Sequence, residues 1–318
     1  MSDQPRGTKP TAASDGSVDA TASVTAAPGA ANVTAAPGAA NVTVAPGAYR
    51  PKSDMPFFAG LGILAGSYVV LIAAMLLADA GYARLGDFGR ILADPDIRYA
   101  IRLSLISSTI TTVLALWVAV PIAYLMSRTR FPGKNLLDGF LDIPLILPPL
   151  VVGLCLLILF RQTRLSLLDD WLQIAFHVPA VILAQFAVAA AFAVRTLRAT
   201  FDELSPRQEQ VALTLGCSRS QAFWLVVLPE ARYGLLTAAT LAWARSLGEF
   251  GPILVFAGAT RQKTEVLPTS VYLELSVGNV EGAVAVSLLM IALALAVLFV
   301  VRTLARGHIA GGFFGRGI

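Results

Sequence analysis

The sequence is poor in charged residues, cysteine and histidine. Of its 318 residues, 56% are hydrophobic and only 14% are charged, whereas a soluble domain typically carries about 25% charged residues. The two cysteines lie far apart and the two histidines have no partner at metal-ligand spacing, so we expect neither a disulfide framework nor a metal site. The formal net charge of +4 comes from scattered basic residues, which argues against nucleic-acid binding.

The motifs of several enzyme classes are also missing from the sequence. It has no Walker A pattern (Gly-x-x-x-x-Gly-Lys-Ser/Thr), so any ATP on which the protein depends must be bound by another subunit. We find no nucleophile elbow, no His-rich cluster and no carboxylate pair with a base. We therefore expect this chain to bind no cofactor and to catalyse no covalent chemistry.

The first 54 residues have a different composition from the rest of the chain. A nine-residue unit rich in Ala, Pro, Gly and Thr occupies residues 25–33, repeats over residues 34–42 and begins again at Thr43. Such a segment buries too little apolar surface to offset the entropy of ordering. The sequence predicts a disordered tail over residues 1–54.

Long apolar runs predict an all-α membrane protein with six transmembrane helices. A helix needs about 20 apolar residues to cross the hydrocarbon core. The runs cover residues 57–78, 103–126, 136–160, 178–194, 232–257 and 283–301. We expect a six-helix domain over residues 55–306 and a short C-terminal tail over residues 307–318.

The distribution of Lys and Arg favours one orientation of these spans. Six spans place both termini on the same side of the membrane. The segments on that side hold 13 Lys and Arg residues and the segments on the other side hold 8. Because basic residues are enriched in cytoplasmic segments, we expect both termini in the cytoplasm.

The third apolar run contains polar and helix-breaking residues. Pro148 and Pro149 predict a bend in the helix over residues 136–160. Asp138 and Asp142 lie one turn apart, so a metal site or an acid pair is one interpretation. We favour an interaction of Asp138 with the helix start and a buried hydrogen bond for Asp142.

The fifth apolar run carries an ion pair at membrane depth. Arg245 and Glu249 are four residues apart, so they share a helix face and can pair. Gly248, Gly251 and Pro252 argue against a straight helix beyond Glu249. One interpretation is a structural pair that joins two spans, and the other is that Arg245 lines a path for an anion.

A polar island over residues 206–229 separates the fourth and fifth runs. It predicts a helix over residues 208–215, a glycine stop at Gly216 and a second helix that begins with capping-box spacing at Ser218 and Gln221. Near the end of the island, a proline predicts a kink or break. Two short helices around a glycine elbow either rest on the lipid surface or form a docking element for a soluble partner.

The island resembles the EAA loop of the permease subunits of bacterial ABC importers. Gln210 and Val211 replace the usual Glu and Ala, and Glu209 lies one place early, whereas the other positions fit. The resemblance implies that the loop is a cytoplasmic coupling helix that inserts into a cleft of an ATPase subunit. The implied docking residues are Glu209, Gln210, Val211, Ala212, Gly216, Leu228 and Pro229.

Three further strings resemble the molybdate, tungstate and sulfate branch of these permeases, and the molybdate permeases most of all. They are Arg-Phe-Pro-Gly-Lys at residues 130–134, Asp-Ile-Pro-Leu-Ile-Leu-Pro-Pro at residues 142–149 and Ala-Arg-Ser-Leu-Gly-Glu-Phe-Gly at residues 244–251. The resemblance implies the type I ABC importer permease fold in a bacterial inner membrane. The candidate residues for the translocation path are Asp142, Pro148, Arg245, Gly248 and Glu249.

The resemblance also implies the partners of the chain. These are ABC ATPase subunits that bind ATP and Mg²⁺, an extracytoplasmic oxyanion-binding protein, and a second copy of the permease. Molybdate or tungstate is the expected substrate, and a sulfate or thiosulfate permease is the alternative. Two other classes, a secondary anion transporter and a membrane scaffold, remain open, although the sequence lacks the internal symmetry that the first predicts.

Overall fold

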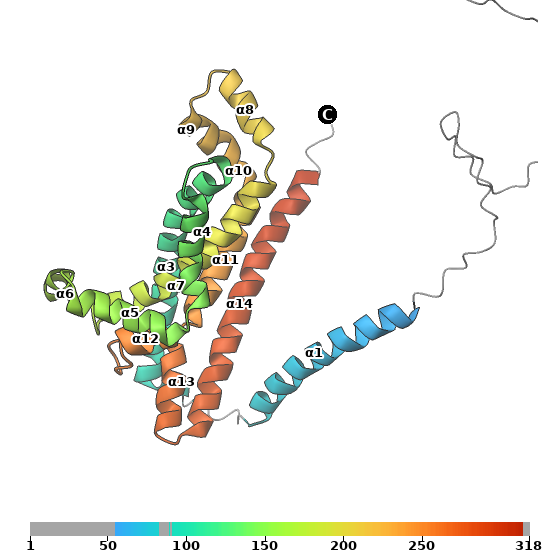
Figure 1. The fold of residues 1–318 in the computed structure, drawn as a ribbon. Helices are drawn as coiled ribbons and strands as arrows, with labels where there is room; N and C mark the ends of the chain where they lie inside the picture. The colour runs from blue at the N-terminus through green and yellow to red at the C-terminus, as the bar shows by residue number, and fades with distance from the viewer. Residues whose placement is uncertain (1–54, 83–88, 90, 314–318) are drawn as a thin grey trace, which may run out of the picture. The chain divides into compact units, whose positions relative to one another are not determined.

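The computed structural model describes residues 55–82, 89 and 91–313, and every regular element in these ranges is a helix (Figure 1). The predicted disordered tail, residues 1–54, lies outside the described residues. The elements, of which η1 is a π-helix, are α1 (Met55–Tyr82), α3 (Pro95–Arg128), α4 (Lys134–Ile146), α5 (Pro149–Gln162), α6 (Ser166–Leu172), α7 (Val178–Glu203), α8 (Pro206–Thr214), α9 (Arg219–Ala222), η1 (Phe223–Val227), α10 (Leu228–Glu230), α11 (Arg232–Leu247), α12 (Gly251–Phe256), α13 (Leu267–Ser276) and α14 (Val280–Phe313).

Among the described residues, four helices are long and apolar enough to cross a membrane by themselves: α1, α3, α7 and the Val280–Phe299 part of α14. Two bent pairs meet the same test when each pair is taken together. They are α4 with α5, bent by 110°, and the Arg219–Glu230 segment with α11, bent by 71°. Counting each pair as one span gives six, the number that the apolar runs predict.

The chain divides into two parts, residues 1–69 and residues 70–318, and the packing described below concerns the second part. Its centre is formed by α3, α7 and α11, which contact one another along most of their lengths. Small side chains line the contacts, among them Ala119 of α3, Ala193 of α7 and Ala238 of α11, all fully buried. Small residues allow the close backbone approach on which helix association in lipid depends.

The third predicted span is not one helix. α4 ends at Ile146 and α5 begins at Pro149, and the chain turns by 110° between them. The helical region is disfavoured for a residue that precedes a proline, and both Leu147 and Pro148 precede one. Both are accordingly extended, with ψ of 139° and 135°. The predicted bend is therefore confirmed, and the continuous span over residues 136–160 is corrected to a broken pair.

The fifth predicted span is also shorter than expected. α11 ends at Leu247, and the chain resumes as the six-residue helix α12. This confirms the expectation that no straight helix continues beyond Glu249. The segment 258–282, which lies between the fifth and sixth apolar runs, contains the helix α13. Pro268, at the start of α13, is placed where its missing N–H costs nothing.

The two short helices that follow these breaks cross each other closely. A Cβ atom added to Gly153 of α5 would lie 2.8 Å from both the Cα and the carbonyl oxygen of Pro252 in α12. On the other side of the crossing, a Cβ atom on Gly251 would lie 3.0 Å from Cβ of Pro149. Glycine is therefore required at Gly153 because the neighbouring atoms belong to the backbone.

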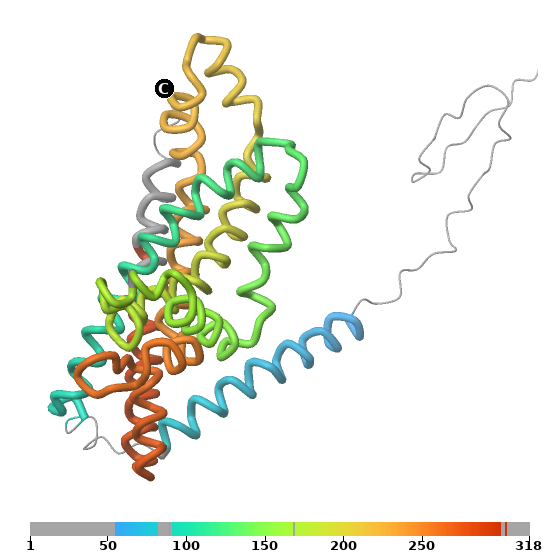
Figure 2. Tube along the Cα trace, turned by 60° about the vertical axis from the view of Figure 1, so that its left-hand side comes forward, coloured from blue at the N-terminus to red at the C-terminus, as the bar shows by residue number. Residues whose placement is uncertain are grey.

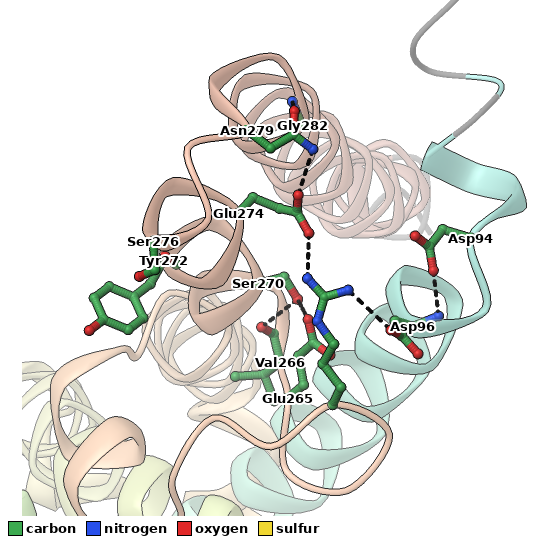
Figure 3. Close-up of polar contacts among 11 residues, drawn as sticks. Asp94, Asp96, Glu265, Val266, Ser270, Tyr272, Glu274, Ser276, Asn279 and Gly282 are labelled. Carbon is green, nitrogen blue, oxygen red and sulfur yellow. Dashed lines mark hydrogen bonds and ion pairs between the residues drawn. The ribbon is translucent and has the colours of Figure 1, made fainter.

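A polar cluster ties the first turn of α3 to α13 and the start of α14 (Figure 3). Arg261 donates to Asp96 Oδ2 at 3.1 Å and to Glu274 Oε1 at 2.9 Å, and Asn279 donates to the second oxygen of Glu274 at 2.7 Å. Beside this cluster, burial raises the pKa of the Glu265 carboxyl. Figures 1 and 2 show α13 at one end of this part of the molecule and α8 at the other.

Replacing Gly153 with alanine should destabilise the protein. The new methyl group would force α5 and α12 apart, and overpacking of this kind costs about 1–3 kcal/mol. The matched control is Gly139→Ala in α4, where an added Cβ meets nothing within 4 Å. Thermal unfolding of the purified variants in detergent measures the effect. Equal melting temperatures for the two variants would contradict the tight crossing.

Candidate functional site

The glycine elbow of the polar island forms as the sequence predicts. α8 ends after Thr214, and Gly216 takes a φ of +91°. The N–H of Gly216 donates to the carbonyl of Leu213 at 3.1 Å, and the N–H of Cys217 donates to the carbonyl of Ala212 at 3.1 Å. These two bonds define a Schellman motif, which satisfies the free carbonyls at a helix end. The elbow is therefore fixed by local backbone bonds.

The second helix of the island begins with a complete capping box. The N–H of Gln221 donates to Ser218 Oγ at 3.2 Å, and the N–H of Ser218 donates to Gln221 Oε1 at 2.8 Å. The reciprocal bonds satisfy two backbone donors that a helix start leaves free. The predicted start of the second helix is confirmed.

The chain leaves the island through a widened helical turn. Over η1, the N–H of Leu228 bonds to the carbonyl of Phe223, five residues earlier. Pro229 follows this turn. Proline has no backbone N–H to donate, and in a normal helical turn its ring would clash with the carbonyl four residues before it. The actual break comes two residues after the predicted one, at Ala231, where the chain bends by 71° into α11.

The predicted docking residues fall into an exposed set and an inward set. Gln210 is exposed, and so are Val211 and Leu215, with exposed fractions of 56% and 79%. Val211 and Leu215 lie four residues apart and therefore share one face of the helix end. Ala212 is buried, and Glu209 points toward α3, where its side chain is only 13% exposed. Leu228 is half-buried and Pro229 is exposed.

The intramembrane ion pair that the spacing predicts is present at the end of α11. A terminal nitrogen of Arg245 contacts the carboxylate of Glu249, which is 1% exposed, whereas the Arg245 side chain is 30% exposed. The guanidinium also lies 5.8 Å from the ring centroid of Phe192 in α7. Gly248, the C-cap of α11, lies between the paired residues, so the pair sits where the helix breaks.

Two further ion pairs join α4 to α7. Arg195 donates through Nε to Asp142 Oδ1 at 2.7 Å and through a second nitrogen to Oδ2, a bidentate contact. Arg198 pairs with Asp138 and also lies near Asp202, with 3.8 Å between Nε and Oδ2. The hydrogen bond expected for Asp142 is therefore present, but it is not buried as expected, because the side chain of its partner Arg195 is 64% exposed. The role expected for Asp138 at the helix start is corrected, since its partner belongs to another helix.

Hydropathy alone does not indicate Arg195 and Arg198 as site residues, because the fourth apolar run ends at residue 194 and leaves both in the loop that follows. In the structure both lie within α7, which continues to Glu203. One signal was available. Two carboxylates four apart in one span face two arginines three apart in another, and both spacings place each pair on one helix face.

Two of the predicted path residues, Asp142 and Arg245, lie beside neighbouring positions of α7. Asp142 faces α7 through Arg195, and Arg245 faces α7 through Phe192, three residues earlier on the same face of that helix. Pro148 lies apart from both pairs, at the 110° break between α4 and α5. In the part of the chain that the structure describes, no group of three or more His, Cys, Asp or Glu residues could hold a metal ion.

Comparison with known proteins identifies the family. Residues 119–310 match the model of the binding-protein-dependent transport system inner membrane component. The chain belongs to this family. It is 35% identical over 249 residues to the molybdenum transport system permease protein ModB of Mycobacterium tuberculosis, which covers 77% of this chain and 92% of the relative. It is 32% identical over 235 residues to the sulfate transport system permease protein CysT of Escherichia coli, covering 72% and 83% of the two chains.

The fold is that of a type I ABC importer permease. A bacterial alginate ABC transporter, solved in complex with a pentasaccharide-bound periplasmic protein, has a chain that superposes with a TM-score of 0.66. The match covers 80% of this permease and 94% of that chain at 16% identity. The predicted all-α fold and the molybdate and sulfate branch are therefore confirmed.

Removing Arg245 should destabilise the permease because Glu249 would remain buried without its partner. Breaking a buried pair on one side costs several kcal/mol, and the partial exposure of Arg245 reduces this to about 1–3 kcal/mol. The double variant Arg245→Ala/Glu249→Gln should recover most of the loss, because the buried charge is then absent. Thermal unfolding in detergent measures both. A double variant no more stable than Arg245→Ala would contradict the pairing.

Proposed function

We propose that this permease imports molybdate, with tungstate as a close second substrate. The observation that carries the proposal is the 35% identity to a molybdenum transport permease over 92% of that protein. The 32% identity to a sulfate transport permease makes sulfate the alternative substrate. All three substrates are tetrahedral dianions, so the same cationic side chains can serve each of them.

The proposed path passes the arginines of α7 and α11. The side chain of Arg195 is 64% exposed and that of Arg245 is 30% exposed, so both guanidinium groups offer free N–H donors beside their carboxylate partners. A guanidinium can bind an oxyanion through two parallel hydrogen bonds. A second copy of the permease, placed against the same face, would complete the walls of the path.

The proposed ATPase-docking element is the segment from α8 to η1. Its support is the elbow at Gly216 and the exposed apolar pair formed by Val211 of α8 and Leu215, the residue that caps α8. An apolar helix face is the kind of surface that a groove on a partner protein accepts. Since ATP is available to a partner only in the cytoplasm, this end of the molecule and both termini are proposed to be cytoplasmic. A loaded extracytoplasmic binding protein would then deliver the anion at the end that carries α13.

Uptake of labelled anions by cells tests the substrate. Cells that lack this permease and then regain it, with the neighbouring ATPase and binding protein present, should regain molybdate uptake that excess sulfate does not compete. Restored sulfate uptake would show that the permease imports the alternative substrate, sulfate. Failure to restore either would overturn the oxyanion assignment, and uptake that persists when the ATPase is absent would favour a secondary transporter.

Replacing Gly216 with valine should weaken ATPase docking. A β-branched residue resists the φ of +91° at this position, although an added Cβ meets nothing within 4 Å. The matched control is Gly216→Asn, because asparagine tolerates this conformation better than other non-glycine residues. Co-purification of the ATPase with the permease measures docking. Undiminished co-purification with Gly216→Val would show that the elbow conformation is not required.

A further inference from the structure

Tyr124 of α3 contacts the end of α7, which leads into the docking element, and two parts of the element itself, α8 and η1. Its hydroxyl donates to Glu209 Oε1 of α8 at 2.5 Å. Its ring packs edge-on against Phe201 in the last turns of α7, with 5.9 Å between centroids, and against Phe223 of η1, with 4.8 Å. One side chain of a membrane-spanning helix therefore contacts the end of a second span, α7, and two helices of the docking element, α8 and η1.

Arg128, one helical turn further along α3, reinforces the same contact. Its Nε lies 3.3 Å from Glu209 Oε2, and its Nη2 donates to the carbonyl of Leu204, the C-cap of α7, at 3.1 Å. The side chains of Arg128 and Glu209 are each 13% exposed. Because a pair shielded in this way is screened less than a surface pair, it can fix the position of a short helix.

Apart from its packing against η1 and α9, little else holds α8 in place. Of its nine residues only Ala212 is buried. A hollow of about 610 Å³ lies between α8, η1 and the end of α3, with Tyr124, Arg128 and Glu209 in its wall. Since α8 is not packed tightly against α3, its position depends on these polar contacts, together with its two chain connections.

The helix to which α8 is tied crosses the whole second part of the molecule. α3 runs without interruption from Pro95 to Arg128, which is about 50 Å at 1.5 Å per residue. At its far end, Asp96 bonds to Arg261 and Gln262, beside α13. A displacement of Glu209 can therefore reach the opposite end of the bundle through a single helix.

We propose that Tyr124 and Arg128 are positioning residues for coupling: they bind Glu209 so that movement of α8 moves α3. The inference rests on the proposed function, in which an ATPase docks on this loop. In this arrangement Glu209 serves the connection within the permease, whereas exposed residues of α8 such as Val211 serve the contact with the ATPase.

The test uses the full permease, purified with its ATPase and reconstituted in lipid vesicles with the binding protein and labelled molybdate. Tyr124→Phe keeps the ring and removes the hydrogen bond. The variant complex should assemble and hydrolyse ATP, while anion uptake per ATP hydrolysed falls about fivefold, the change in an equilibrium that one hydrogen bond commonly supports. Glu209→Gln should lower the same ratio. Arg130→Glu, an exposed position two residues past Arg128, is the control and should leave it unchanged.

A charge exchange separates the positioning role from a merely structural one. Arg128→Glu and Glu209→Arg should each lower uptake per ATP, and the double variant should recover at least half of the loss. No recovery in the double variant, or an unchanged ratio in both Tyr124→Phe and Glu209→Gln, would overturn the proposal. A wrong proposed function would give a different result from a wrong positioning role. In that case the unmodified permease itself would neither retain the ATPase nor take up the anion.

Discussion

The close packing of α3 against α7 is the contact on which the other features depend. The facing residues are small, as at Ala115, Ala119 and Ala189, and none of these is exposed. A hydrogen bond across the interface, from Thr111 Oγ1 to Gln185 Oε1 at 3.1 Å, adds a polar contact between buried side chains. In lipid, apolar side chains gain nothing from leaving water, so small residues and such bonds supply the association energy. The positions of α3 and α7 then determine where Arg195 and Arg198 of α7 meet α4 and where Tyr124 and Arg128 of α3 meet α8.

The breaks in the helices depend on this frame. Backbone groups freed at a break must find partners inside the protein, because lipid offers none. The turn at Leu147 and Pro148 and the turn after Leu247 bring α5 and α12 together at the crossing of Gly153 with Pro252. At these two breaks, irregular backbone thus lies where two short helices cover each other. The buried carboxylate of Glu249 is beside the same break.

Local features of the site could be predicted from the sequence, and contacts between distant segments could not. The elbow at Gly216, the capping box of α9 and the pair Arg245–Glu249 each depend on residues within five positions of one another. The partners of Asp142 and Glu209 lie 53 and 85 residues away. Nothing in either local pattern specifies them, because they follow from how α4, α8 and α3 pack.

The limits of the apolar runs were unreliable for a related reason. Hydropathy reports whether a segment suits lipid or a protein interior, but it does not report where a helix must turn. The run over residues 136–160 is apolar on both sides of its break, so it predicts one span. Conversely, α7 continues past its apolar run to Glu203, because Arg195 and Arg198 find carboxylates on α4 and need not end the span.

These pairings bear on how a dianion could pass. An unpaired arginine in a low-dielectric passage would bind a dianion tightly and hold it, whereas conduction requires binding that is weak enough for release. Arg195, Arg198 and Arg245 each have a carboxylate partner, so each pair is close to neutral while the guanidinium still offers hydrogen-bond donors. In the proposed import, such pairs would guide the anion without trapping it. Selectivity would then have to come from the binding protein, which binds the anion before it reaches the permease.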